Sequence, residues 1–388
     1  MKASCSMFSQ IRKLFPRIEF ERLVRETKAE YRSKGLSSWS QFVAMLFCQL
    51  GRAHSLREIE GGLKSCEGKL AHLGIEAPAR SSLSYYANNH RPWELLQKVF
   101  YELFEKVAAK AQGKRKFRFK NKLVSIDSTT IDLCLSMYDW AKFRRTKGAV
   151  KLHLVLDHDG YLPCFGIITD GKVHDVKAAH QIGFAPGTIV VDDRGYNDYR
   201  LFAKWTDAGV FFVTRMKDNA LFEVIEQRTP PQNRNILRDQ IVRLTGVGAQ
   251  DKCPHLLRRI EAVREDTGEV LVFVTNHHAL GASTIAAIYK ERWQIELFFK
   301  ALKQNCKIKT FVGTSPNAVK TQIWTALIAM LLLRYLQLSS RFGWSLSNLV
   351  ALLRMNLFTH RDLIAWLDEP FGTPPDPQDN PQASLAFA

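Results

Sequence analysis

The stretch YKERWQIELFFKALK, residues 289–303, has the pattern of one amphipathic helix. Its apolar side chains form a stripe that predicts packing against a core: Ile288, Ile295, Phe298, Phe299 and Leu302. A second set of side chains, spaced 3, 4 and 7 residues apart, is polar: Tyr289, Arg292, Glu296 and Lys303. At about 100° per residue, these four fall within an arc of roughly 60° on one side of the helix. They form either a solvated face joined by ion pairs or a row of functional groups around Glu296.

Composition predicts a folded soluble protein with a polyanionic partner. The chain has 388 residues, of which 46% are hydrophobic, and this is enough for a core and two or three domains. Its formal charge is +17, from 55 basic and 38 acidic residues. Such an excess favours nucleic acid, with a membrane surface as the second candidate. The longest apolar run, Ile323 to Leu333, has about half of the roughly 20 residues that a spanning helix needs, so we expect a core helix and no membrane.

Cysteine usage restricts the compartment and the metal chemistry. The seven cysteines are odd in number, scattered and never in a CxxC pair, and residues 1–20 lack the apolar core of a signal peptide. We therefore expect a reducing cytoplasm and no zinc framework. Any bound metal must be held by carboxylates, which points to a hard ion such as Mg²⁺ or Mn²⁺.

The first 112 residues read as helices only, and a helix-turn-helix pattern follows Leu56. Within SSLSYYANN, residues 81–89, we expect three side chains to face inward: Leu83, Tyr86 and Ala87. The side chains left facing outward suit base edges and phosphates: Ser82, Tyr85, Asn88, Asn89 and Arg91. DNA reading by this pair and plain helix packing both remain open, because helix pairs joined by a turn are common.

A basic segment, GKRKFRFKNK at residues 113–122, follows the helices. Its basic side chains alternate with two phenylalanines, and those that we take as candidate DNA contacts are Lys114, Arg115, Lys116, Arg118 and Lys120. The segment is either a solvated linker or an arm that follows a phosphate backbone.

From residue 123 the pattern changes to strands. The order is three strands, helix, strand, helix, strand, and this mixed order is typical of a ribonuclease-H-like α/β sheet. The predicted segments are a helical N-terminal domain (1–112), a first part of the core (113–215), a β-rich insertion (216–268), a second part of the core (269–315), a C-terminal helical region (316–369) and a disordered tail (370–388).

Acidic residues interrupt two of the predicted strands. Asp127 lies in SIDSTT, and Asp192 and Asp193 lie in VVDDRGY. Aspartates at strand ends commonly cap turns, but a carboxylate on an apolar strand can also bind a cation. If Asp127 and Asp193 lie on neighbouring strands, they can converge with Glu296 and hold two divalent ions roughly 4 Å apart.

These motifs together resemble those of the "IS-four" family of bacterial insertion-sequence transposases, in the DDE class. The signature Y-x-x-R-x-x-x-E-x-x-x-x-x-x-K is matched by Tyr289, Arg292, Glu296 and Lys303. SIDSTT and DDRGY resemble the first and second aspartate motifs, and FSQIRKLFPRIEF, residues 8–20, resembles the N-terminal region of one subgroup. The resemblance implies a ribonuclease-H-like catalytic core with a β-rich insertion, preceded by an all-helical DNA-binding domain.

The resemblance also implies residue roles. Asp127, Asp193 and Glu296 would be catalytic ligands of two Mg²⁺ or Mn²⁺ ions, and Asp193 is chosen because it directly precedes Arg-Gly-Tyr. The expected contacts to the DNA end are Tyr289, Arg292 and Lys303, together with Arg194, Lys300 and Trp293, of which the tryptophan packs beneath the row. Some relatives cut through a DNA hairpin with a tryptophan of the insertion, and no tryptophan lies between Trp205 and Trp293 here. The resemblance therefore does not predict a hairpin.

The function implied is a DNA transposase that binds terminal inverted repeats, cleaves the 3′ ends and joins them to target DNA. Double-stranded DNA and a second copy of the chain, in a synaptic complex, are the implied partners, and the compartment is the bacterial cytoplasm, with the nucleoid when DNA is bound. The alternatives are a ribonuclease-H-fold nuclease that does not join strands and an inactive DNA-binding regulator.

Overall fold

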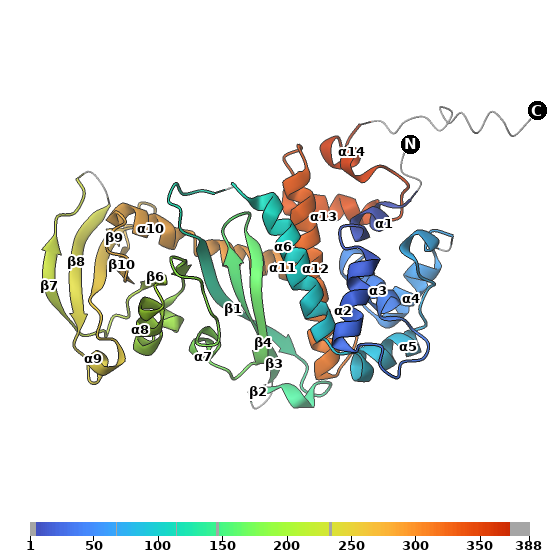
Figure 1. Cartoon of the computed structure of the whole chain (residues 1–388), viewed down its shortest axis with the longest axis horizontal. Coiled ribbons are helices and arrows are strands. Elements are labelled where there is room, and N and C mark those ends of the chain that lie inside the picture. Colours follow the sequence, from blue (N-terminus) through green and yellow to red (C-terminus); the bar gives the residue numbers. More distant parts are fainter. Residues whose placement is uncertain (1–4, 67, 114, 145–146, 233–234, 373–388) are drawn as a thin grey trace, which may run out of the picture.

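The structure is a computed structural model that describes residues 5–66, 68–113, 115–144, 147–232 and 235–372 (Figure 1). The N-terminal part contains helices and, among its described residues, no strand. Its α-helices are α1 (Met7–Arg12), α2 (Arg17–Thr27), α3 (Ser38–Leu50), α4 (Leu56–Lys64), α5 (Arg80–Tyr85) and α6 (Glu94–Ala111). Short helices η1 (Ala71–Leu73) and η2 (Tyr86–His90) lie between them. The prediction of a helical N-terminal region is confirmed.

Local sequence explains where several of these helices begin. The side chains of Ser37 and Ser55 accept hydrogen bonds from backbone N–H groups of the first turns of α3 and α4. Pro16 is the N-cap of α2, and it separates this helix from α1 because proline cannot continue a helix from the preceding turn.

One mixed sheet forms the centre of the molecule, in the order β2-β3-β1-β5-β6-β10-β9-β8-β7, with β4 paired to β3. Its first strands are β1 (Leu123–Leu133), β2 (Lys142–Arg144), β3 (Lys147–Asp157) and β4 (Leu162–Asp170). The short helix η3 (Asp139–Ala141) lies between β1 and β2. After β4 come α7 (Asp175–Ala179), β5 (Ile189–Val191), η4 (Arg194–Tyr196), α8 (Tyr199–Asp207) and β6 (Phe211–Arg215). β3 is antiparallel to both of its neighbours β1 and β4, whereas β5 is parallel to both β1 and β6. This is the element order predicted for a ribonuclease-H-like core.

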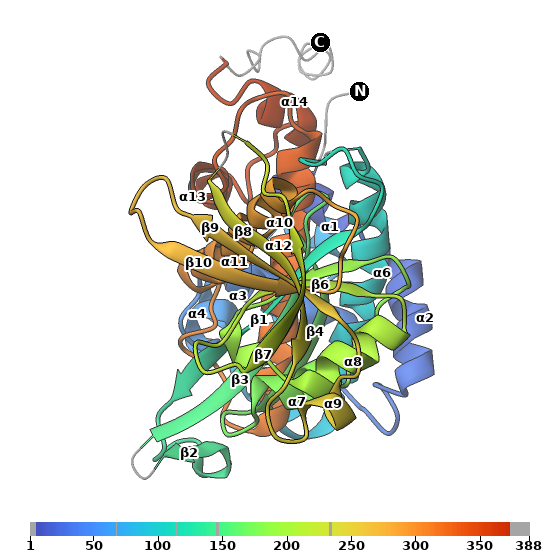
Figure 2. The same cartoon turned by 90° about the vertical axis from the view of Figure 1, so that its left-hand side faces the viewer.

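The β-rich insertion extends the same sheet. It consists of β7 (Phe222–Arg228), β8 (Ile236–Leu244), α9 (Ala249–Lys252) and β9 (Leu257–Val263), and the chain then returns in β10 (Val270–Thr275). Because β10 is antiparallel to both β6 and β9, the insertion continues the core sheet outward. Figure 1 shows these strands at one end of the molecule and the N-terminal helices at the other, and Figure 2 shows the twist of the sheet between them. The exact domain boundaries stay predictions.

Between β10 and residue 372, the last one described, lie five helices: α10 (Ala282–Lys290), α11 (Trp293–Asn305), α12 (Pro316–Ser339), α13 (Leu346–Met355) and α14 (Leu363–Asp368). By length and composition α12 could cross a membrane, but 83% of its apolar window is buried inside the protein. Its Trp324 stacks on Trp93, next to the start of α6, and contacts Phe100 of α6. The predicted core helix is thereby confirmed. The predicted tail lies outside the described residues from 373 onward.

The two faces of the sheet carry different residues, because successive side chains of a strand point to opposite sides. Val191 of β5 belongs to a core cluster with α10, and Ile131 of β1 packs with α11. Ile126 of β1 and Val190 of β5 instead belong to the cluster formed with α8. Odd-numbered residues of β1 and β5 therefore face α10 and α11, and even-numbered residues face α8.

Candidate active site

One predicted acidic residue, Asp127, lies on β1, and another, Asp193, follows the end of the adjacent strand β5. β1 and β5 are parallel, and Ser125 pairs with Val191 in their register. Asp127 and Asp193 each follow that pair by two residues, so both lie toward the same end of the parallel pair, on the face of α10 and α11. This register agrees with the expectation that the two carboxylates come from neighbouring strands. Their catalytic role stays a prediction.

Asp192 and Asp193 have opposite environments. Asp192 is fully buried, and the Thr214 side chain is the polar group that acts against the effect of burial on its carboxyl. Burial raises the pKa of this carboxyl well above its usual range. Asp193 is partly exposed, and its Oδ1 accepts a hydrogen bond from the Gly195 N–H at 2.7 Å. Of the two, Asp193 is the one whose carboxyl is accessible to a ligand.

The helix that carries Glu296 is not continuous through residues 289–303, so the prediction of a single helix is wrong. α10 ends at Lys290, and α11 begins at Trp293. Glu291 is the C-cap of α10, with its N–H bonded to the carbonyls of Ile288 and Tyr289. The helical pattern alone could not indicate this break, because the buried contacts of the Glu291 side chain are made with distant segments.

Arg292 connects two of the three predicted ligands. Its Nη2 donates to Glu296 Oε1 at 2.5 Å, and its Nη1 lies 3.8 Å from Asp127 Oδ2. The pKa of Asp127 is raised to about 7, first by burial and further by the negative charges of Asp193 and Glu296. The hydrogen bond from the Ser128 N–H and the charge of Arg292 act in the opposite direction. The carboxylates are therefore close enough to interact electrostatically, and Arg292 is their counter-charge.

The donor chemistry of these residues fits a hard divalent cation. Carboxylate oxygens are the ligands that Mg²⁺ and Mn²⁺ prefer, and the mutual repulsion that raises the pKa of Asp127 is what a bound cation would neutralise. In the described part of the chain, however, no three His, Cys, Asp or Glu side chains are placed close enough to hold a metal ion. A cation held by Asp127 and Glu296 would require Arg292 to release both carboxylates.

The remaining residues of the row have mixed environments. Tyr289 is partly buried, with its ring 4.8 Å from that of Phe273, and Arg292 lies over its other side. Lys303 donates through Nζ to the Thr130 carbonyl of β1 at 3.1 Å. Trp293 is 55% exposed, so the expectation that it packs beneath the row is wrong. The first turn of α11 turns this side chain outward.

Other predicted DNA contacts on the core face solvent. Lys300 is exposed on α11. Arg194 forms an ion pair of 2.9 Å with Asp218 at the surface. Such an exposed pair contributes little to stability, so Arg194 remains available to a phosphate.

The basic arm at residues 115–122 lies close to the α10–α11 break. Lys116 Nζ is 2.5 Å from Glu291 Oε1, and Arg115 Nε is 2.9 Å from Asp159 Oδ2. Arg118 and Lys120 are exposed, whereas Lys114 is outside the described residues. Two of the predicted DNA contacts are thus engaged with acidic residues of the protein itself.

The predicted helix-turn-helix segment is confirmed in part. The side chains expected to face inward are buried: Leu83, Tyr86 and Ala87. Tyr85 is exposed and stacks on His90 with ring centroids 4.1 Å apart, and Ser82 is partly exposed. The side chain of Asn88 is outside the described residues. Arg91, expected to face outward, is instead buried and donates to Gln41 Oε1 at 2.7 Å. A distant acceptor on α3 draws this guanidinium inward.

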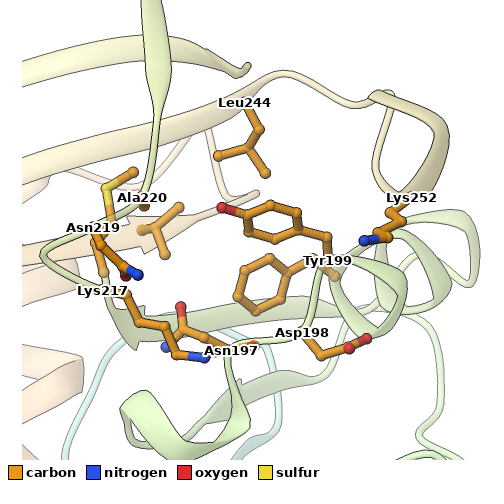
Figure 3. A pocket seen from close by; sticks show the side chains of 11 residues that line it. Asn197, Asp198, Tyr199, Lys217, Asn219, Ala220, Leu244 and Lys252 are labelled. Carbon is orange, nitrogen blue, oxygen red and sulfur yellow. Dashed lines mark hydrogen bonds between the residues drawn. The ribbon is translucent and has the colours of Figure 1, made fainter. Parts of the chain in front are cut away.

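A cavity of about 280 Å³, which the sequence did not predict, lies beside the loop that follows Asp193 (Figure 3). Side chains from this loop, from the start of the insertion and from β8, α9 and β10 line it, among them Asn197, Tyr199, Lys217, Leu244 and Lys252. Lys217 Nζ donates to the Asn197 carbonyl at 3.1 Å across the wall of the cavity. The lining residues are far apart in sequence, so no local motif could have revealed the cavity.

Comparison with known proteins gives two family matches. A model described as "Transposase DDE domain" matches residues 118–332. A second model, described as a domain of unknown function, matches residues 4–76, within the helical N-terminal part.

Individual proteins and a solved structure are also similar. A putative transposase, y4zB, of Sinorhizobium fredii is 35% identical over 283 residues, which cover 72% of this chain and 78% of the relative. A probable transposase for insertion sequence element IS5377 of Geobacillus stearothermophilus is 29% identical over 246 residues, or 63% of this chain and 64% of the relative. A cryo-EM structure of the piggyBac transposase synaptic complex with hairpin DNA matches 95% of this chain and 82% of that chain, at 10% identity and a TM-score of 0.44.

Proposed function

Because this chain belongs to the DDE transposases of the "IS-four" family of insertion sequences, we propose that it cleaves transposon 3′ ends and joins them to target DNA. The resemblance drawn from the Tyr-Arg-Glu-Lys signature is thus confirmed at the level of the family. The finer steps of the proposal are recognition of terminal inverted repeats, hydrolysis at the 3′ ends and direct transesterification.

The observation that carries this proposal is the position of three carboxylates on one side of the sheet. Asp127 and Asp193 extend from adjacent parallel strands, and the charge of Glu296, on α11, contributes to the raised pKa of Asp127. Carboxylates held together in this way repel one another, and a phosphodiester substrate brings further negative charge. Positive charge beside the carboxylates offsets this repulsion, and Arg292 supplies it next to Asp127 and Glu296.

DDE transposases generally use a divalent metal ion. Asp127, Asp193 and Glu296 would hold two Mg²⁺ or Mn²⁺ ions. When bound, such ions polarise the phosphodiester and activate a water molecule or a 3′-hydroxyl for attack. The protein's own contribution is to orient the carboxylates from two strands and a helix. Arg292 and Lys303 contribute positive charge for the phosphate backbone.

The partners in this proposal are double-stranded DNA, as inverted repeats and as target, and a second copy of the chain. Two transposon ends have to be held together before joining, which is why a synaptic homodimer is expected. The charge of +17 supports a DNA partner in the bacterial cytoplasm and nucleoid. The exposed side chains of Tyr85, Arg118 and Lys120 are candidate contacts outside the catalytic face.

Cleavage and joining can be tested on linear DNA that carries the repeats flanking the gene, incubated with the protein and Mg²⁺. Products mapped at nucleotide resolution should show nicks at the 3′ ends and joined strands. Asp127→Asn and Glu296→Gln should each abolish cleavage but leave binding of the DNA end largely intact, because both residues act on metal rather than on DNA. Loss of binding in step with cleavage would contradict this role.

The same products distinguish the alternatives. Cleavage without joined strands, together with a gene that lacks flanking inverted repeats, would indicate a nuclease. Full retention of every measurable DNA activity in Glu296→Gln would indicate a DNA-binding regulator. Hairpin ends would be visible in the same assay as a separate product.

A further inference from the structure

A buried carboxylate that no motif includes lies directly before Arg292. Glu291 is located in the break between α10 and α11, and only 4% of its side chain is exposed. Its Oε1 is 2.5 Å from Lys116 Nζ, and its Oε2 accepts a hydrogen bond from the Tyr161 hydroxyl at 3.0 Å. Both oxygens are therefore satisfied, which is the condition under which a buried carboxylate is tolerated.

The two partners of Glu291 come from separate segments of the chain. Lys116 belongs to the basic arm before β1, and Tyr161 lies in the turn between β3 and β4. The backbone of Tyr161 has a φ of 54°, a left-handed conformation that a tyrosine rarely adopts. This conformation has a cost in backbone energy, and the hydroxyl reaches the helix break from this turn.

A second buried contact continues this network to the strand of Asp127. His158 follows β3, and its Nε2 is 2.7 Å from the Ser125 hydroxyl oxygen. The His158 and Tyr161 rings are in edge contact, with centroids 5.6 Å apart. Ser125 precedes Asp127 by two residues on β1, and Glu291 precedes Arg292 by one residue and Glu296 by five. The network therefore spans from the start of α11 to the strand opposite it.

We propose that Glu291 is a positioning residue that fixes the start of α11 relative to β1, and so sets the geometry between Glu296 and Asp127. The inference rests on the proposed function of those two carboxylates. Lys116 then serves chiefly to neutralise Glu291 and to fasten the basic arm across the helix break. A change in this network should move the carboxylates slightly, and displacements of about 1 Å can reduce a reaction rate on the order of a hundredfold.

The proposal distinguishes Lys116 from an ordinary phosphate contact. A lysine that binds DNA phosphate contributes about one unit to the slope of binding affinity against salt concentration. A lysine that neutralises Glu291 contributes to the cleavage rate but not to this slope. The two possibilities give opposite results for Lys116→Met.

The test compares Glu291→Gln, Tyr161→Phe, Lys116→Met and the double variant Lys116→Met with Glu291→Gln. Asp159→Asn is the matched control, because Asp159 holds the same arm through Arg115 at 2.9 Å but does not contact the helix break. For each full-length protein we would measure the single-turnover cleavage rate, the Kd for end DNA with its salt slope, the thermal midpoint and Mn²⁺ binding by calorimetry.

We expect Glu291→Gln to reduce the cleavage rate about tenfold to a hundredfold and to weaken Mn²⁺ binding about tenfold. The Kd for DNA should stay within about twofold, since no DNA contact is removed. Lys116→Met should also reduce the cleavage rate and weaken Mn²⁺ binding, with an unchanged salt slope for DNA binding. The double variant should lose less cleavage activity than the two single losses would give if they were additive. Tyr161→Phe should give a smaller loss, and Asp159→Asn none.

Three results would overturn the proposal. The first is a Glu291→Gln protein that melts at a lower temperature but cleaves and binds Mn²⁺ as the wild type does. The second is a Lys116→Met protein whose salt slope falls by about one while its cleavage rate at saturating DNA is unchanged. The third is a wild-type protein that binds no Mn²⁺ at all. A wild type that binds Mn²⁺ but never cuts end DNA would contradict the proposed function alone, and the Mn²⁺ affinities would still test the positioning role.

Discussion

The two faces of the sheet at the end of β5 show how neighbouring aspartates acquire different chemistry. Asp193 lies on the face of α11, where it is partly exposed and where Arg292 provides positive charge. Asp192, one residue earlier, lies on the face of α8 and is fully buried. A shift of one residue along the chain after β5 thus separates a candidate metal ligand from a carboxyl whose pKa burial raises well above its usual range.

The face of the sheet toward α8 has its own network of polar side chains around Asp175. Asp175 of α7 accepts a hydrogen bond from Ser128 at 2.6 Å and pairs with Lys151 at 3.2 Å. His153, whose side chain is fully buried, lies beside Asp175 and contacts Thr169 at 2.9 Å. Asp175 is the common neighbour of these groups, whereas on the α11 face burial and neighbouring negative charges raise the pKa of Asp127 to about 7.

The largest expected difference between the faces is in activity. Asp193→Asn should reduce cleavage of end DNA by more than about a hundredfold, because it removes a proposed metal ligand. Asp192→Asn is nearly isosteric and removes no proposed metal ligand, so this variant should cleave within about threefold of the wild type. Single-turnover assays on both purified variants measure this contrast. Equal losses in the two would show that the face of the strand does not decide function.

A smaller effect is expected from the pH dependence of stability on the α8 face. Burial lowers the pKa of His153 from 6.5 to about 4, so the folded state keeps this ring neutral while the unfolded state takes up a proton. The stabilisation is therefore present above pH 6.5 and is lost as pH falls toward 4. His153→Gln should remove about 2 kcal/mol of the wild-type loss between pH 7 and pH 5 in urea unfolding. Identical pH profiles for both proteins would contradict the assignment.

A third effect is expected in the affinity for end DNA when basic residues on the α11 face are replaced. Arg292→Ala should weaken binding of end DNA about tenfold and lower the salt slope by about one, if this guanidinium moves from the carboxylates to a phosphate. Lys303→Ala should lower the slope similarly. Arg264→Ala, at an exposed ion pair in the insertion, is a control that should leave the slope unchanged. An unchanged slope in Arg292→Ala would indicate that the arginine stays with the carboxylates when DNA binds.

The smallest effect is expected for Tyr196, on the α8 face. Its hydroxyl is buried and has no hydrogen-bond partner among the described residues. Tyr196→Phe should therefore leave the free energy of unfolding unchanged or raise it by up to about 1 kcal/mol. Chemical denaturation measures this change, with Tyr199→Phe as a control at the cavity. A marked loss of stability would reveal a partner for the hydroxyl.

Local pattern was sufficient for much of the fold. Strand periodicity located β1, β3 and β5, and the spacing of apolar residues located the N-terminal helices. The break at Glu291 and the burial of Arg91 could not be predicted in this way. In both cases a charged side chain is bonded to residues far away in sequence. The periodicity of a local segment contains no information about such contacts. The exposure of Trp293 follows from that break, since the break sets where the turns of α11 begin.

The sequence by itself determined which carboxylates to consider, because aspartates on apolar strands and a glutamate in a fixed motif are local features. It also determined the sign of the expected partner, since net charge depends on composition alone. Only the tertiary structure decided which face each carboxylate occupies, which cation accompanies it and which oxygens remain buried. Those properties arise when strands and helices distant in sequence come into contact, and solvent exclusion and charge at short range then set the pKa of each group.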